Sequence, residues 1–145
     1  MNKKNYLSFA KKSANIQIRE LKKIKSIFNS SFINAVDLVN NCKGKVIFSG
    51  VGKNSYICKK AAATFSSVGV PSFFVDPTGV SHGDAGQIEK KDVLIIISNS
   101  GNTLELTNLL KFANRFKIKI IGIASNLNSI LMKASDIKII YPKLR

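Results

Sequence analysis

From Lys45 onward, short apolar runs alternate with segments of helical spacing, and this alternation constrains the fold more than any other feature. The clearest run, Val93–Ile97, has five consecutive apolar residues, four of them β-branched, which is typical of a strand buried on both faces. Strands that alternate with helices form right-handed crossovers and a parallel sheet. The sequence therefore predicts an α/β fold with a doubly wound, five-stranded parallel sheet flanked by helices. The predicted strands are 46–48, 72–75, 93–97, 118–124 and 137–141, and the predicted helices among them are 54–68, 103–116 and 129–134.

A helical arm precedes this core. Residues 3 to about 41 contain neither glycine nor proline and carry apolar side chains at helical spacing. A polar stretch divides the arm into two predicted helices, with Ser30 or Ser31 as the N-cap of the second. At 145 residues, 45% of them apolar, the chain is long enough for one globular domain with its own core. We expect a single domain over 1–145, with N-terminal helices over 1–44 and an α/β core over 45–145.

The formal net charge of +15 indicates a general attraction for anionic ligands. Most of the 23 basic residues are lysines, dispersed along the chain without the motifs of nucleic-acid-binding proteins. We interpret them as solvated faces and expect no nucleic-acid partner; a nucleic-acid-associated protein is the weakest alternative. No apolar run has the length of a membrane span or of a signal-peptide core, so we expect a cytoplasmic protein without a membrane partner. Cys42 and Cys58 lack metal-ligand spacing, and we expect free thiols, no metal and no cofactor.

The loop Ser98-Asn99-Ser100-Gly101-Asn102-Thr103 follows the strand 93–97 directly and leads into a predicted helix. Such a turn aims hydroxyl groups and backbone N–H groups at one point, and the positive end of the helix dipole adds to their field. The loop is therefore predicted to hold a phosphate group. An ordinary strand-to-helix turn with an N-cap is the alternative. The predicted phosphate ligands are Ser98, Asn99, Ser100 and Thr103.

A glycine-rich turn, residues 49–53, follows the first predicted strand. It is not a Walker A motif, because Ile47 and Asn54 stand where that motif needs glycine and Ser or Thr. A dinucleotide-binding motif is a weak alternative, since Ser55 occupies the third glycine position. We expect a tight turn that brings backbone N–H groups and Lys53 to an anionic ligand. Its substrate-loop residues are Ser49, Gly50 and Gly52.

Two further side chains are candidates for acid–base chemistry. His82 is the only histidine and lies in a glycine-rich loop, where it serves either a site or a structural hydrogen bond. Glu105 is placed to act as a general base beside the phosphate loop. Alternatively, with Asn102 as the N-cap, Glu105 occupies the third helical position and closes a capping box.

The motifs Ser-Gly-Val-Gly-Lys, His-Gly-Asp and Ser-Asn-Ser-Gly-Asn-Thr, in this order and spacing, resemble those of the sugar isomerase (SIS) domain. Within it, the chain is most similar to the arabinose 5-phosphate isomerases of the lipopolysaccharide Kdo pathway. The resemblance extends over Gly50–Tyr141. It implies a homo-oligomer, a dimer or a tetramer, which interconverts D-ribulose 5-phosphate and D-arabinose 5-phosphate without a metal cofactor.

The resemblance also implies roles for particular residues. Glu105 matches a catalytic glutamate that transfers the proton between C1 and C2. His82 matches a histidine that serves in ring opening or proton shuttling. Lys53 matches a lysine that stabilises the anion. The residues implied to hold the phosphate are again Ser98, Asn99, Ser100 and Thr103.

The chain departs from the family at its end. The family continues past the fifth strand with a second catalytic glutamate and with a helix that carries a second histidine, whereas this sequence stops at Arg145. We therefore expect a form truncated after the fifth strand, weakly active, with apolar surface on one sheet face and strong self-association. The alternative is a non-catalytic, regulatory SIS domain that binds a phosphosugar.

Overall fold

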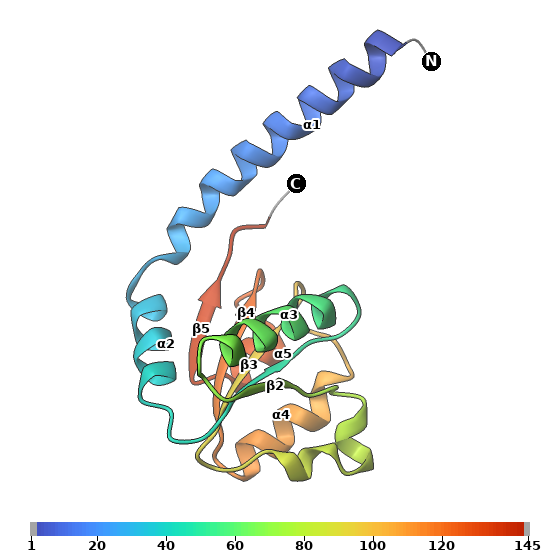
Figure 1. The fold of residues 1–145 in the computed structure, drawn as a ribbon. Coiled ribbons are helices and arrows are strands. Elements are labelled where there is room, and N and C mark those ends of the chain that lie inside the picture. The colour runs from blue at the N-terminus through green and yellow to red at the C-terminus, as the bar shows by residue number, and fades with distance from the viewer. Residues whose placement is uncertain (1–2, 144–145) are drawn as a thin grey trace.

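A computed structural model describes residues 3–143 and places a five-stranded sheet between two layers of helices (Figure 1). All neighbouring strands are parallel, as the sequence predicts. The first strand pairs with the second on one side and with the third on the other, so the chain reverses direction across the sheet at β1. In sheet order the strands are β2 (Ser72–Phe74), β1 (Val46–Ser49), β3 (Val93–Ile97), β4 (Lys119–Ala124) and β5 (Ile137–Ile140).

Each sheet face has its own apolar core, because successive strand residues point to opposite faces. Leu94 and Ile120, for example, pack with α4 (Leu106–Arg115) and α5 (Ile130–Ala134) on one face. On the other face, the strands pack with α2 (Ser30–Asn40) and α3 (Lys53–Ser67). Burial of both faces explains the uninterrupted apolar runs and confirms the doubly wound fold.

The N-terminal arm contains α1 (Lys3–Lys23), a 3-10 turn (Ile24–Ile27) and α2. The predicted cap of the second helix is wrong by one residue. Asn29 has extended backbone angles, and its side chain accepts a hydrogen bond from the Ser31 backbone N–H at 2.9 Å, so Asn29 is the N-cap.

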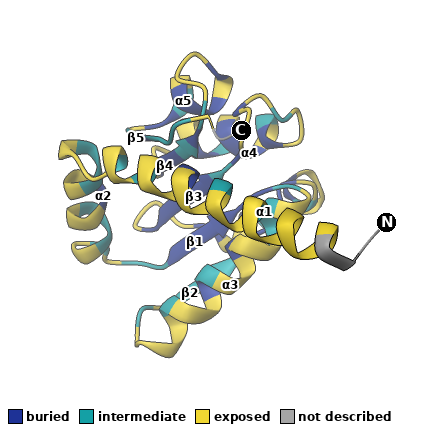
Figure 2. Cartoon of the chain, turned by 90° about the horizontal axis from the view of Figure 1, so that it is seen from above, coloured by how far each residue is buried: buried dark blue, intermediate teal, exposed yellow. Residues whose placement is uncertain are grey.

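The first helix, α1, extends away from the body of the domain (Figure 1), and Figure 2 shows it exposed along most of its length. Between residues 3 and 143, no helix is both long and apolar enough to cross a membrane. The glycine-rich loop that holds His82 contains two short 3-10 turns, Gly79–His82 and Asp84–Gln87.

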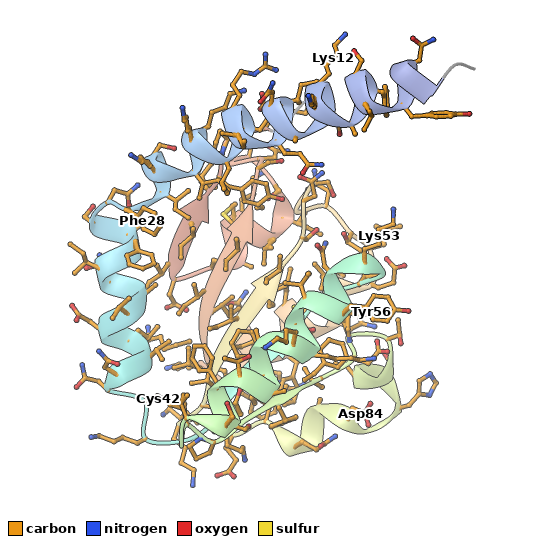
Figure 3. The ribbon with its side chains drawn as sticks, turned by 45° about the horizontal axis from the view of Figure 1, so that its top comes forward. Lys12, Phe28, Cys42, Lys53, Tyr56 and Asp84 are labelled. Atoms are coloured by element: carbon orange, nitrogen blue, oxygen red, sulfur yellow. The ribbon has the colours of Figure 1, made fainter. Side chains whose placement is uncertain are left out.

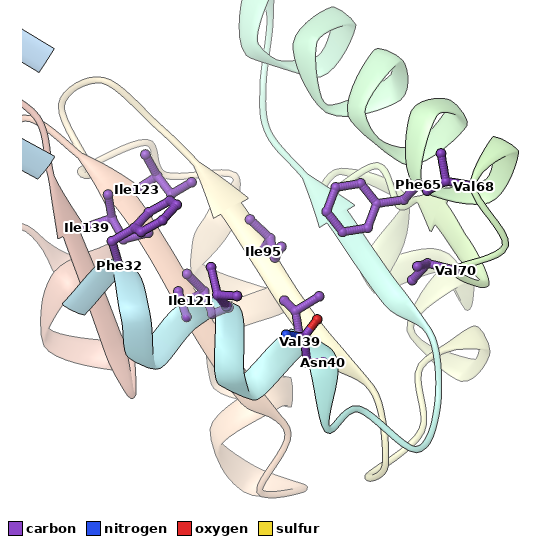
Figure 4. A pocket seen from close by; sticks show the side chains of 12 residues that line it. Phe32, Val39, Asn40, Phe65, Val68, Val70, Ile95, Ile121, Ile123 and Ile139 are labelled. Atoms are coloured by element: carbon purple, nitrogen blue, oxygen red, sulfur yellow. The ribbon is translucent and has the colours of Figure 1, made fainter. Parts of the chain in front are cut away.

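An apolar groove lies between α2 and α3, over the middle of the sheet (Figure 4). It has a volume of about 350 Å³. The strands contribute Ile95 and Ile121, and the helices contribute Phe32, Val39 and Phe65.

Candidate functional site

The loop 98–105 joins β3 to α4 at the carboxyl edge of the sheet, between the ends of β1 and β4. Parallel α/β sheets bind ligands at this edge. The backbone N–H groups of Ser100, Thr103 and Leu104 make no hydrogen bond in the described part of the chain. They precede the N-terminus of α4, where the helix dipole favours an anion.

Ser98 shapes this loop from inside. Its side chain is buried, and its Oγ lies 2.9 Å from the Thr103 Oγ1 while it accepts a hydrogen bond from the Gly101 N–H at 3.1 Å. Gly101 has φ +67°, and a Cβ there would lie 2.1 Å from the Ser129 Oγ, so this position requires glycine. Ser98 thus stabilises the turn, whereas the partly exposed Thr103 remains available to a ligand.

Asn99 is hydrogen-bonded to the residues that directly follow β4 and β5. Its Oδ1 accepts a hydrogen bond from the Tyr141 hydroxyl at 2.8 Å. Its backbone carbonyl accepts from both the N–H and the hydroxyl of Ser125, at 3.0 and 2.8 Å. Burial raises the pKa of Tyr141, so its hydroxyl keeps its proton and remains a donor at neutral pH.

A cavity of about 510 Å³ adjoins the loop on its β4 side. Ser100 is exposed there, and Lys143 brings a positive charge. The sequence analysis did not predict a role for Tyr141, for Lys143 or for the polar residues after β4. A signal for the residues after β4 exists, because polar residues that follow a buried strand also identified the loop after β3. The cavity is lined by Asn99, Ser100, Ser125, Asn126, Leu127 and Lys143.

The glycine-rich turn lies beside the phosphate loop, because β1 pairs with β3. A Cβ on Gly50 would stand 3.0 Å from the Ile97 carbonyl oxygen and 3.1 Å from the Cys58 Sγ, so the turn packs closely against the end of β3. Gly52 has φ +60°, which favours glycine. Lys53 follows at the exposed start of α3 (Figure 3).

Two side chains beneath this turn are buried. The first is the side chain of Ser49, whose Oγ has no hydrogen-bond partner in the described residues. The other is the Cys58 thiol, which donates to the Ser49 carbonyl, and burial raises its pKa to about 11. The Cys58 thiol is therefore protonated and unreactive at neutral pH.

The loop that contains His82 is hydrogen-bonded to α4. Ser81, next to His82, accepts a hydrogen bond through its Oγ from the Asn108 Nδ2 at 2.8 Å. Asn108 lies one helical turn after Glu105. The hydrogen bond between Asn108 and Ser81 therefore holds the loop of His82 against the helix that Glu105 precedes. The side chains of His82 and Glu105 are both exposed.

The alternative role of Glu105, in a capping box with Asn102, is wrong. The helix α4 begins at Leu106, so Glu105 occupies the N-cap position and its side chain makes no capping hydrogen bond. The Asn102 Oδ1 instead accepts from the Ile130 N–H at 3.0 Å, which ties the loop to α5. A tertiary contact thus replaces the local cap, and Glu105 is free of that structural role.

The candidate catalytic residues are not bonded to one another. Across residues 3–143, no hydrogen bond or ion pair joins Lys53, His82 or Glu105 to another of the three. Within the same residues, no three His, Cys, Asp or Glu side chains gather as metal ligands would. Hydrogen bonds within the loop 98–103 and to neighbouring segments thus hold it in shape, whereas the candidate acid–base groups are separate, exposed side chains.

Comparison with known proteins identifies the family of the chain. The SIS domain family matches residues 39–145. The arabinose 5-phosphate isomerase KdsD of Francisella tularensis is 41% identical over 136 residues, which cover 92% of this chain and 42% of that protein. An uncharacterised protein of Rickettsia prowazekii is 38% identical, over 99% of this chain and 45% of its own length. The chain thus spans less than half the length of these curated relatives.

Solved structures show the same fold. The E. coli CFT073 protein c3406, in complex with arabinose 5-phosphate, superposes with a TM-score of 0.85 at 36% identity, covering 98% of this chain and 76% of that chain. A Listeria monocytogenes protein superposes with a TM-score of 0.90 at 26% identity, over 100% of this chain and 76% of its own.

Proposed function

The chain belongs to the SIS domain family, and on this basis we propose that it is an aldose–ketose isomerase that interconverts D-ribulose 5-phosphate and D-arabinose 5-phosphate. The observation that carries the proposal is the loop 98–103, whose free N–H groups and hydroxyls precede the N-terminus of α4 at the carboxyl edge of the sheet. The similarity to arabinose 5-phosphate isomerases at about 40% identity supports the choice of sugar.

The proposed ligand is a pentose 5-phosphate, with its phosphate group on the loop. Ser100, Thr103 and the free N–H groups donate to the phosphate oxygens, while Ser98 holds the loop in shape. The sugar then extends toward the glycine-rich turn and the start of α4, where Lys53 and Glu105 lie.

The proposed reaction moves one proton from C2 to C1 and one from the C2 hydroxyl to the C1 oxygen, and it needs no external oxidant. His82 assists opening of the sugar ring. Glu105, as a carboxylate, removes the proton from C2 of the aldose, and the electron pair forms the C1–C2 double bond of an enediol as the C1 carbonyl oxygen takes up a proton. Glu105 returns its proton to C1 while the C2 hydroxyl loses one, which gives the ketose. Lys53 stabilises the negative charge that develops on the oxygens.

A second candidate function is a regulatory domain that binds a phosphosugar without converting it. The observation that favours it is the contrast between the loop, which hydrogen bonds within it and to neighbouring segments hold in shape, and the exposed acid–base residues, which share no hydrogen bond across residues 3–143.

Titration calorimetry with arabinose 5-phosphate and with arabinose, together with an isomerase assay on ribulose 5-phosphate, tests both candidates. Binding of the phosphorylated sugar alone, with turnover, supports the isomerase. Binding without turnover supports the regulatory domain. Equal affinity for arabinose and its phosphate, or no binding of either, contradicts both.

The wider setting of this activity is also a proposal. Relatives named arabinose 5-phosphate isomerase KdsD and KpsF support a role in supplying arabinose 5-phosphate for Kdo and lipopolysaccharide synthesis in the cytoplasm. We further propose a homo-oligomer, a dimer or a tetramer.

A further inference from the structure

Tyr141 lies just beyond β5 and outside every motif that identified the site. Its backbone N–H donates to the Ala124 carbonyl at 3.1 Å, and its hydroxyl donates to the Asn99 Oδ1 at 2.8 Å. A single residue therefore connects the ends of β5 and β4 with the loop that follows β3.

The backbone of Asn99 is fixed independently of its side chain. Ser125, the residue after β4, donates to the Asn99 carbonyl oxygen through both its N–H and its hydroxyl. The main chain at Asn99 thus has a fixed position, and the remaining freedom of this residue is the orientation of its amide group.

In the structure the amide has its Oδ1 toward the Tyr141 hydroxyl, which donates to it at 2.8 Å. A tyrosine hydroxyl that donates to Oδ1 leaves the Nδ2 group, with two N–H donors, at the other end of the amide. Nδ2 makes no hydrogen bond in the described part of the chain, and Asn99 lines the cavity that also contains Ser100 and Lys143. A turned amide would instead present an oxygen to the phosphate oxygens and repel them.

We propose that Tyr141 is a positioning residue, which holds the donor end of the Asn99 amide toward the phosphate group of the ligand. This role rests on the proposed function, because it requires a phosphosugar on the loop 98–103. The ligand chemistry is that of a phosphate monoester dianion, and inorganic phosphate carries the same recognition elements.

A double-mutant cycle tests the proposal. The wild-type chain, Tyr141→Phe, Asn99→Ala and the double variant are titrated with arabinose 5-phosphate and with inorganic phosphate. Loss of one hydrogen bond that orients a donor predicts about a three- to tenfold weaker affinity for Tyr141→Phe. In the Asn99→Ala background the same substitution is expected to have no further effect. Tyr6→Phe, on the distant and exposed α1, is the matched control and should bind as wild type does.

Asn99→Asp provides a second measurement that does not alter Tyr141. The carboxylate still accepts from the Tyr141 hydroxyl but has no N–H to donate, so affinity is expected to fall at least about tenfold, through repulsion of the phosphate. Circular dichroism confirms that each variant is folded before titration.

The outcomes separate this role from the proposed function. If the wild type binds arabinose 5-phosphate and either Tyr141→Phe or Asn99→Asp binds equally well, the positioning role is overturned and the proposed function stands. An equal loss for Tyr141→Phe in both backgrounds overturns it as well, because Tyr141 then acts without Asn99. A wild-type chain that binds neither probe overturns both proposals.

Discussion

The hydroxyl groups of Ser98 and Thr103 lie 2.9 Å apart and close the turn of the phosphate loop from within. The same Ser98 Oγ accepts the Gly101 N–H, so one buried oxygen supports two points of the loop. The residues that identify the loop in the sequence therefore divide into those that shape it, such as Ser98, and those whose side chains are exposed, such as Ser100.

Ser98→Ala is expected to destabilise the fold and to weaken phosphate binding. It leaves the Gly101 N–H without its acceptor, which costs about 1–3 kcal/mol in the free energy of unfolding. Urea denaturation measures the loss, and calorimetry measures the affinity. Ser100→Ala is the control: Ser100 is exposed and its Oγ accepts only the exposed Asn102 N–H, at 3.2 Å, so its stability should change by less than about 0.5 kcal/mol while its affinity still falls. Equal stability losses for the two variants contradict this division of roles.

Gly101→Ala is expected to lower the melting temperature and the affinity together. The added Cβ would lie 2.1 Å from the Ser129 Oγ, on a residue whose φ of +67° disfavours any side chain. We expect a loss of about 1–3 kcal/mol. Gly86→Ala, where a Cβ meets nothing within 4 Å, is the control for glycine replacement in general. A Gly101→Ala protein as stable as Gly86→Ala would refute the packing argument.

Glu105→Gln is expected to lower the isomerase rate by about a hundredfold or more without weakening phosphate binding. The amide cannot accept the proton from the sugar, but the loop that holds the phosphate is unchanged. Turnover of ribulose 5-phosphate and calorimetry report the two properties separately. The control is Glu89→Gln, because Glu89 is paired with Lys45 and Lys91 near the opposite edge of the sheet. An unchanged rate in Glu105→Gln removes Glu105 from the mechanism.

The stability of the domain is expected to fall in acid, in part through Asp136. Burial by itself raises the pKa of this carboxyl, but hydrogen bonds from the Lys119 side chain and the Ile120 N–H outweigh it and hold the pKa below its usual value. A carboxyl with a depressed pKa stabilises the fold above its unfolded pKa of about 3.9, and that contribution is lost as the pH falls through the lower folded value.

Melting curves between pH 2 and pH 7 measure this effect. Asp136→Asn should be less stable than wild type at pH 7, and the difference should shrink below about pH 4. Asp37→Asn, with its side chain exposed on α2, should follow the wild-type curve. A difference between Asp136→Asn and wild type that is constant with pH contradicts the assignment.

Self-association is expected to depend on the apolar groove between α2 and α3. Val36 lines the groove, whereas Ile33, on the same helix and 60% exposed, does not. Val36→Lys places a charge on the apolar surface and should shift the chain toward monomer, while Ile33→Lys should leave its association unchanged. Light scattering across a concentration series measures the difference. A wild-type chain that stays monomeric at high concentration contradicts the prediction.

The sequence predicted the strands well because burial on both faces leaves a continuous apolar run. Val93–Ile97 begins and ends as predicted, since polar residues stand at both of its ends. Local caps were predicted less well. Asn102 was placed at a helix start on its residue type, but its side chain bonds to Ile130, which lies 28 residues away in the chain. No local pattern contains that contact.

The candidate site was also predicted only in part, because some of its contacts join residues that are far apart in the sequence. Ser98 and Thr103 belong to one continuous motif, and the structure joins them. Ser125 and Tyr141 reach Asn99 only because β4 lies beside β3 and β5 follows β4 in the sheet. Their importance depends on strand order, which a motif within a single loop does not encode.

The link between Tyr141 and Asn99 also bears on how the chain folds. It spans 42 residues and closes only when the last two strands have joined the sheet. Contacts between such distant residues form late, because the intervening chain must first be ordered. A chain that has assembled only as far as β3 would have the residues of the loop without its geometry. Affinity for a phosphosugar would therefore develop last during refolding, as a measure of completed assembly.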